Sequence, residues 1–178
     1  MENNTQQHQA LHSYCLYPET RFETQVDQET VILTLRAHPI TQIYWVANAV
    51  IFFVLLVVAN FLFPSFFTAN QILFIDVFGI VFILNYLWFN FLNWFFNVGI
   101  ITNQRIVDVD FTMIIYKEVT ATHLEKVEDI TSESGGYFPS FFDYGNVFVQ
   151  TAGTQDRIEF ENVPHPTQVV KIINGLLP

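Results

Sequence analysis

Hydrophobic residues fill two long runs near the middle of the chain, and polar residues dominate on both sides of them. Between Arg36 and Arg105 the sequence contains a single charged residue, Asp76. The two runs, Ile43–Phe63 and Ile72–Phe96, contain about 21 and about 25 residues, and a helix needs about 20 apolar residues to cross a bilayer. Within lipid, only a helix or a closed barrel satisfies its own backbone hydrogen bonds. The pattern therefore predicts two transmembrane helices.

The segment between the runs, Pro64–Gln71, contains no Lys or Arg and predicts a short external turn. Arg36 and Arg105 flank the hairpin at its other end. Because basic residues concentrate on the cytoplasmic side of membrane helices, we expect both termini in the cytoplasm and a multi-pass protein of the inner (plasma) membrane. Met1–Thr30 has no signal-peptide pattern. The single Cys15 excludes an internal disulfide, which fits a reducing compartment.

The N-terminal arm, residues 1–28, is polar, and we expect it to be disordered. A β-branched run, Glu29–Arg36, then predicts one strand, and Pro39 predicts a juxtamembrane turn that reaches residue 42. A single strand is not stable alone. We therefore expect its partner to lie in the C-terminal segment.

The C-terminal segment, residues 97–178, reads as strand-like runs separated by turn residues. One run alternates apolar and acidic residues: Val107, Asp108, Val109, Asp110 and Phe111. This alternation predicts one buried face and one wet face. Beyond Pro166 the apolar residues recur at helical spacing: Val169, Val170, Ile172, Ile173 and Leu176. The segment therefore predicts an α+β domain, an antiparallel meander capped by an amphipathic C-terminal helix.

Four short motifs stand in order around the hairpin. They are Arg36-Ala37-His38-Pro39, Thr102-Asn103-Gln104-Arg105, Tyr144-Gly145-Asn146-Val147 leading to Thr151-Ala152-Gly153, and Val163-Pro164-His165-Pro166. With these motifs the chain resembles the bacterial pleckstrin-homology-like, membrane-flanked domain family, from about Glu29 to Leu177. The resemblance implies a pleckstrin-homology-like domain at a membrane. It implies no reaction, because the biochemical role of the family is poorly defined.

Charge and motif content exclude several classes of function. The chain has 7 Lys and Arg against 17 Asp and Glu, a net charge of −10. Residues 98–178 alone contain five basic and eleven acidic residues, a net charge of −6. Because phosphates are bound by clustered Lys and Arg, we expect neither specific phosphoinositide binding nor nucleic-acid binding. The five histidines show no metal-ligand spacing and no catalytic motif is present, so we expect no enzyme, metal or cofactor.

Seven residues in and just beyond the second apolar run, most of them polar or small, recur at spacings of three and four. They are Asp76, Gly79, Ile83, Tyr86, Asn90, Asn93 and Asn97. The spacing predicts one face, the seam of a left-handed helix pair. An antiparallel hairpin then brings Asn60 level with Asp76, and Asn48 close to Asn90.

Asp76 has two interpretations. An ionisable residue inside a membrane helix favours an ion or proton relay. Its expected position only about four residues inside the outer end of its helix favours a role in helix registration instead, because a helix N-terminus stabilises a carboxylate.

Five aromatic residues crowd the segment between two predicted strands: Tyr137, Phe138, Phe141, Phe142 and Tyr144. On one interpretation they plug the end of a small barrel or lie in the headgroup layer, where aromatic rings are favoured. On the other they contact a second subunit or a client protein, since aromatic residues are enriched in interface cores.

The sequence thus favours a non-catalytic protein-binding or self-assembly scaffold at the cytoplasmic face of a lipid bilayer, whose partner is a second copy or another membrane protein. The alternative is a small transport or permeation subunit that uses Asp76 and the Asn-lined seam. A scaffold forms a defined oligomer in mild detergent, whereas a transport subunit shows a solute- or pH-dependent flux.

Overall fold

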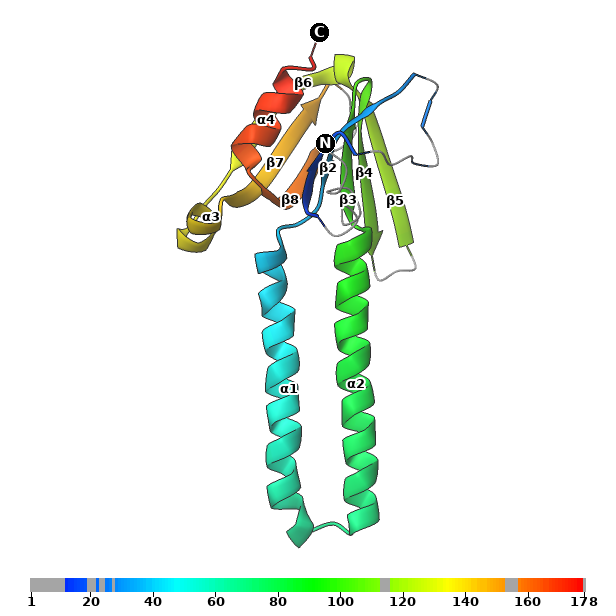
Figure 1. The fold of residues 1–178 in the computed structure, drawn as a ribbon, viewed down its shortest axis with the longest axis vertical. Coiled ribbons are helices and arrows are strands. Elements are labelled where there is room, and N and C mark those ends of the chain that lie inside the picture. Colours follow the sequence, from blue (N-terminus) through cyan, green and yellow to red (C-terminus); the bar gives the residue numbers. More distant parts are fainter. Residues whose placement is uncertain are drawn as a thin grey trace, which may run out of the picture.

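The computed structural model describes residues 12–18, 22, 25–26, 28–112, 116–152 and 157–177. It consists of a domain of two antiparallel sheets and a long helical hairpin that extends from one end of this domain (Figure 1). Both ends of the hairpin join the domain, and the turn of the hairpin lies at the far end.

The hairpin contains helix α1, Ile43–Leu62, and helix α2, Ala69–Phe96. The 3-10 turns η2, Pro39–Gln42, and η3, Phe63–Ser65, stand at the two ends of α1. Helix α2 begins earlier than the predicted Ile72, because Thr68 and Gln71 form a capping box. Both helices are long and apolar enough to cross a membrane.

The first sheet has the strand order β1-β2-β3-β4-β5. These strands are Tyr14–Leu16, Val31–Leu35, Val98–Thr102, Arg105–Thr112 and Tyr116–His123. Strand β2 pairs antiparallel with β3, with Leu35 opposite Gly99. The pairing confirms that the strand before the hairpin has its partner in the C-terminal segment. The hairpin is therefore inserted between two neighbouring strands.

Strand β1 lies in the N-terminal arm that the sequence predicts to be disordered. It pairs with β2, and the Ser13 hydroxyl beside it donates a hydrogen bond to the Ala37 carbonyl at 3.1 Å. The prediction is wrong for Tyr14–Leu16, because a polar composition does not reveal a short edge strand whose hydrogen bonds come from β2. Residues 1–11 of the arm lie outside the described residues.

The second sheet has the order β6-β7-β8. These strands are Val127–Glu133, Tyr144–Thr151 and Ile158–Pro164. The 3-10 turn η4, Leu124–Lys126, leads from the first sheet into the second, and helix α4, Pro166–Asn174, packs on β6 and β7 (Figure 1). Antiparallel strands followed by a C-terminal helix agree with the sequence prediction.

The core lies between the two sheets and α4. Its fully covered side chains include Leu33, Ile101, Ile106, Val147, Val149, Val169 and Ile173. Apolar positions of both sheets and of the predicted helix face thus meet in one cluster.

Strand β4 differs from the predicted pattern of one buried and one wet face. Ile106 and Val107 point to opposite faces, yet their exposed fractions are 0% and 2%. Asp108 shares the face of Ile106 and is half-buried. The wet-face prediction is wrong for Asp108, because the face that it shares with Ile106 is turned toward β8 of the second sheet.

Candidate functional site

The contact between the two long helices contains a polar pair. Asn60 Nδ2 donates a hydrogen bond to Asp76 Oδ1 at 2.6 Å, and lies 3.1 Å from the Leu56 carbonyl oxygen of its own helix. The two residues are level, as the sequence predicts. Asp76 lies about two turns inside α2 and not near its end, because the helix begins at Ala69. Its partner is therefore Asn60 rather than the helix N-terminus.

The middle of the seam is filled by packing. A Cβ atom at Gly79 would lie 2.8 Å from Leu56 Cδ1, so this glycine allows the two helices to approach closely. Ile83 is buried, and the rings of Tyr86 and Phe52 meet edge to face at 5.8 Å. These contacts fix how the two helices face each other.

The remaining asparagines do not join the helices. Asn48 and Asn93 are exposed, which corrects the prediction that they lie in the seam. Asn90 is half-buried, but its amide donates to the Tyr86 carbonyl of its own helix at 2.7 Å. Asn90 therefore uses its amide within its own helix, because an amide inside a helix can bond its own backbone instead of the neighbouring helix.

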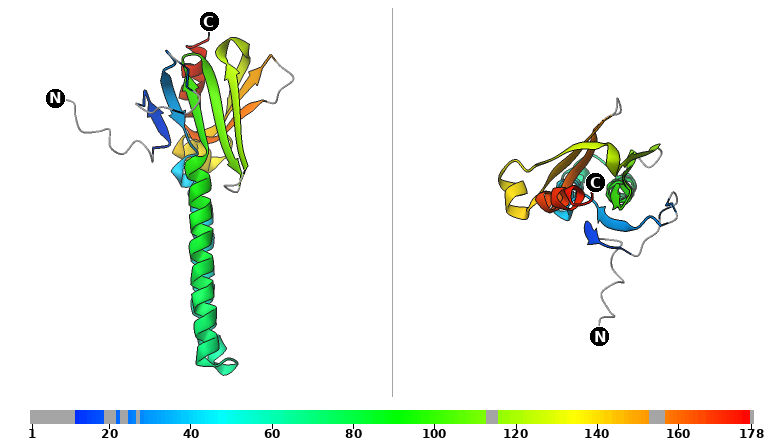
Figure 2. Two further views of the ribbon diagram at one scale, coloured as in Figure 1. Left: turned by 90° about the vertical axis from the view of Figure 1, so that its right-hand side faces the viewer. Right: turned by 90° about the horizontal axis from the view of Figure 1, so that it is seen from above.

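The aromatic segment forms a short helix, α3, Tyr137–Phe142, where the sequence predicts a loop. Gly136 at φ 104° and Asp143 at φ 50° turn the chain into and out of it. Three of its aromatic side chains point outward, with exposed fractions of 95% for Tyr137, 68% for Phe138 and 82% for Phe141. Helix α3 lies at the end of the domain from which the hairpin extends (Figures 1 and 2).

The other two aromatic residues belong to the domain itself. Phe142 is half-buried, with its ring 5.0 Å from that of Phe141. Tyr144 is buried and stacks on His38 at 5.6 Å, which corrects its prediction as a contact residue. Burial and the neighbouring charge of His165 lower the pKa of His38, and His38 Nδ1 accepts a hydrogen bond from the Ile40 amide.

The junction between hairpin and domain is held by hydrogen bonds from both sides. Arg36 Nε donates to the Phe95 carbonyl at 3.1 Å near the end of α2, where a cation is favourable. Trp94 Nε1 donates to the Ala37 carbonyl at 2.8 Å, and the Asn97 side chain accepts from the Phe111 amide at 2.6 Å. The helices therefore enter the domain in a defined geometry.

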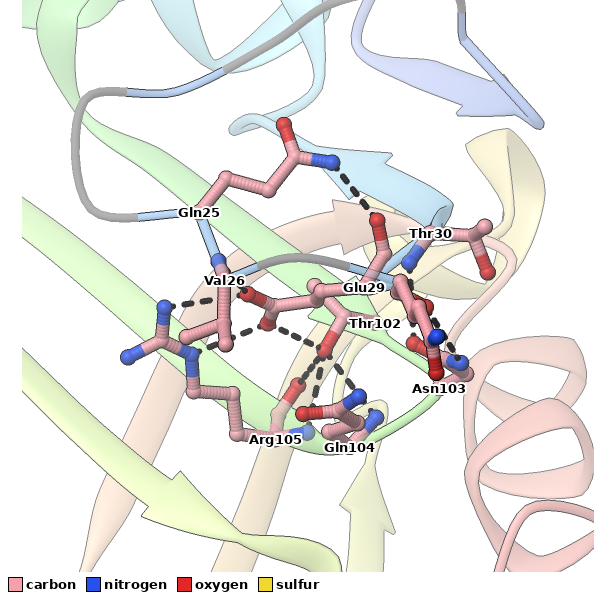
Figure 3. A network of polar contacts seen from close by, with 9 residues as sticks. Gln25, Val26, Glu29, Thr30, Thr102, Asn103, Gln104 and Arg105 are labelled. Atoms are coloured by element: carbon pink, nitrogen blue, oxygen red, sulfur yellow. Dashed lines mark hydrogen bonds and ion pairs between the residues drawn. The ribbon is translucent and has the colours of Figure 1, made fainter.

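A buried ion pair joins the segment before β2 to the turn between β3 and β4 (Figure 3). Glu29 Oε1 lies 2.9 Å from Arg105 Nε and 2.8 Å from the Thr102 hydroxyl. Burial raises the pKa of Glu29, but hydrogen bonds from Arg105, Val26 and Thr102 outweigh it and hold the pKa below its usual range. Glu29 thus holds the segment before β2 against Thr102 and Arg105.

A cleft of about 920 Å³ opens between the two sheets beside the roots of the hairpin. Its lining contains five carboxylates and two guanidinium groups, from Arg36, Asp108, Asp110, Glu118, Arg157, Glu159 and Glu161. At its floor the Phe160 ring rests on Gly99, where a Cβ atom would lie 2.5 Å from Phe160 Cε1. The cleft was not foreseen, because its acidic residues are scattered over three strands.

Asp108 is the most perturbed carboxyl group of this cleft. Burial raises its pKa to about 7, and the nearby charges of Asp110, Glu118 and Glu161 act in the same direction. Burial also raises the pKa of Asp110. No group of three or more His, Cys, Asp or Glu residues in the described part of the chain is arranged to hold a metal ion.

Comparisons with known proteins add one solved structure. No protein-family model and no curated protein matches the chain. The chain is similar to a DUF1696 family protein with a pleckstrin-homology domain from Shewanella loihica PV-4, with 16% sequence identity and a TM-score of 0.36. The matched region covers 46% of this chain and 71% of that chain.

Proposed function

We propose that the chain is an integral membrane protein anchored by α1 and α2. Only 6% of the most apolar window of each helix is buried in the structure, so nearly all of its Phe, Leu, Ile and Val side chains face outward. The 20 residues of α1 extend about 30 Å, the thickness of a bilayer core. Lipid would cover an apolar surface that is far larger than soluble monomers ordinarily expose.

The proposed orientation places the sheet domain and both termini in the cytoplasm. Arg36 and Arg105 belong to the domain end of the hairpin, and the far turn, 63–68, has no basic residue. We further propose a pleckstrin-homology-like domain of the membrane-flanked bacterial type. Two antiparallel sheets with a C-terminal helix support this assignment, as does the position of Arg36-Ala37-His38 at the junction.

At the membrane we propose a non-catalytic scaffold that assembles with copies of itself through α3. The observation that carries this proposal is the exposure of Tyr137, Phe138 and Phe141 on one six-residue helix. Aromatic side chains that are fully exposed in a monomer are the groups that dominate protein interfaces when covered. Their position beside the hairpin would bring neighbouring copies together within the membrane plane.

The test compares two double variants in mild detergent. Tyr137→Ser with Phe141→Ser removes two exposed rings, of which Phe141 lies against Phe142 of the same helix. Leu16→Ser with Tyr17→Ser, at 48% and 71% exposure, removes apolar surface elsewhere and serves as the control. Light scattering behind size-exclusion chromatography should show a smaller oligomer for the α3 variant only. An unchanged oligomer in the α3 variant, with retained folding by circular dichroism, would refute self-assembly through α3.

A further inference from the structure

We propose that the cleft between β5 and β8 binds an extended, Lys- or Arg-containing segment from the membrane-flanking region of a partner protein, which adds a strand to an open sheet edge. This inference deepens the proposed scaffold function and rests on it. It concerns a different surface from α3, so one membrane protein would offer separate surfaces for its own copies and for a client.

The backbone at the cleft is suited to strand addition. Strand β5 ends the order of the first sheet and β8 ends that of the second, so among the described residues each has one edge without a strand partner. The cleft is lined by residues 118–121 of β5 and 158–163 of β8. Near one end, the Asn162 carbonyl accepts a hydrogen bond from the His38 amide at 2.7 Å. An extended peptide recognises such an edge through its main chain.

The side chains of the cleft favour a cationic occupant. Its five carboxylates exceed its two guanidinium groups by three negative charges. One of the two, Arg157, lies over the Phe148 ring at 3.7 Å, and the other, Arg36, bonds the Phe95 carbonyl. Asp108 stands among like charges on the inner face of β4, so an incoming ammonium or guanidinium group would relieve that repulsion.

The charge of the chain itself disfavours a second copy as the occupant. Its seven Lys and Arg residues are scattered singly over 178 residues, and no basic run is present. The position of the cleft, beside the roots of the hairpin, instead indicates that the partner is a membrane protein. Ala37 and Val98, at the two roots of the hairpin, line it. Lys and Arg are concentrated at the same level of other membrane proteins, in the cytoplasmic flanks of their helices.

The test uses the full chain in phosphatidylcholine nanodiscs, whose neutral surface does not attract a basic probe. The probe is a fluorescent decapeptide of alternating Lys and Thr, measured by anisotropy at physiological salt. A copy with Glu in place of Lys reverses its charge, and a copy methylated on every backbone nitrogen keeps its charge but has no N–H group left to pair with a strand. We expect each change to weaken binding at least tenfold.

Two double variants, each of which replaces two carboxyl groups by amides, locate the site. Asp108→Asn with Asp110→Asn removes two carboxylates from the cleft, whereas Glu125→Gln with Glu128→Gln removes two exposed carboxylates outside it. We expect at least tenfold weaker binding for the cleft variant and less than twofold for the control. Equal losses would show unspecific attraction and overturn the proposal. So would tight binding of the methylated peptide, or no binding of the Lys peptide.

A tethered probe tests whether the bound segment belongs to a membrane protein. The oligomer measurement on the α3 variant separates the cleft proposal from self-assembly through α3. Fusing the decapeptide directly to a single-span helix in the same bilayer should lower the concentration for half-saturation at least tenfold. No gain would contradict a membrane-flanking partner. If peptide binding fails while the α3 variant still loses its oligomer, the cleft proposal is wrong and the scaffold stands. If the Lys peptide binds and the α3 variant keeps its oligomer, self-assembly through α3 is wrong and the cleft proposal stands.

Discussion

Replacing Asp108 by Asn should stabilise the protein at alkaline pH and leave it unchanged below about pH 4. Asp108 is half-buried on the inner face of β4, near the charges of Asp110, Glu118 and Glu161. Asn has nearly the same shape and no charge. The substitution therefore removes the repulsion and the cost of burying a charge while it keeps the packing of the cleft wall.

The magnitude follows from the pKa of Asp108. Burial raises this pKa from 3.8 to about 7, which at 1.36 kcal/mol per unit corresponds to an upper limit of about 4 kcal/mol. Solvent screening of a partly exposed carboxyl reduces the expected gain to about 2 kcal/mol. The folded state binds the proton more tightly than the unfolded state. Wild-type stability is therefore lost as pH rises from about 4 to about 7, and the variant is spared this loss.

The assay is thermal unfolding of the full chain in detergent at pH 5 and pH 8, followed by circular dichroism. For a chain of this size, about 2 kcal/mol raises the melting temperature by about 4 to 8 °C. We expect this rise at pH 8 and about a third of it at pH 5, because the loss in the wild type begins near pH 4. Glu128→Gln, an exposed carboxyl outside the cleft, is the matched control. A variant that melts at or below the wild-type temperature at pH 8 would refute the reasoning.

Three further predictions concern the hairpin and the buried ion pair. Replacing residues 39–96 with a short Gly- and Ser-rich linker should yield a soluble folded domain, since β2 and β3 are neighbours; flotation of this domain with anionic vesicles at physiological salt would contradict its acidic charge. Asp76→Asn keeps an acceptor for Asn60 and should cost less than about 1 kcal/mol in detergent unfolding, whereas loss of a proton flux in liposomes would support the transport interpretation. Glu29→Gln leaves Arg105 without its charge partner and should lower stability by about 3 kcal/mol at pH 7. Because the pKa of Glu29 is lowered, this difference should shrink as pH falls below about 4, and guanidinium midpoints at several pH values measure it.

Regular patterns in the sequence predicted the elements well. The two apolar runs became α1 and α2, and helical spacing beyond Pro166 became α4. The antiparallel hairpin alone was also enough to predict that Asn60 and Asp76 lie at the same depth along the two helices. Each of these features depends on residues close in the sequence or on one simple symmetry, which is why periodicity suffices to predict it.

Features that depend on distant partners could not be predicted. Glu29 and Arg105 are separated by 76 positions, and neither has a local pattern that indicates the other. Alternation in β4 identified two faces of the strand, but it did not indicate which face would meet the second sheet. Asp108 was therefore expected to be exposed to solvent. Tyr144 was grouped with its aromatic neighbours, although stacking on His38 across the fold separates it from them.

The insertion of the hairpin between β2 and β3 has a consequence for synthesis. Strand β2 leaves the ribosome before α1, and its neighbour β3 follows only after α2 is complete. If a single helix crossed the membrane, the two strands would lie on opposite sides of the bilayer and could not pair. In the proposed membrane topology, the sheet can therefore close only when both helices span the bilayer or neither does. A closed sheet is therefore incompatible with the insertion of one helix alone, which makes folding of the domain a check against half-inserted hairpins.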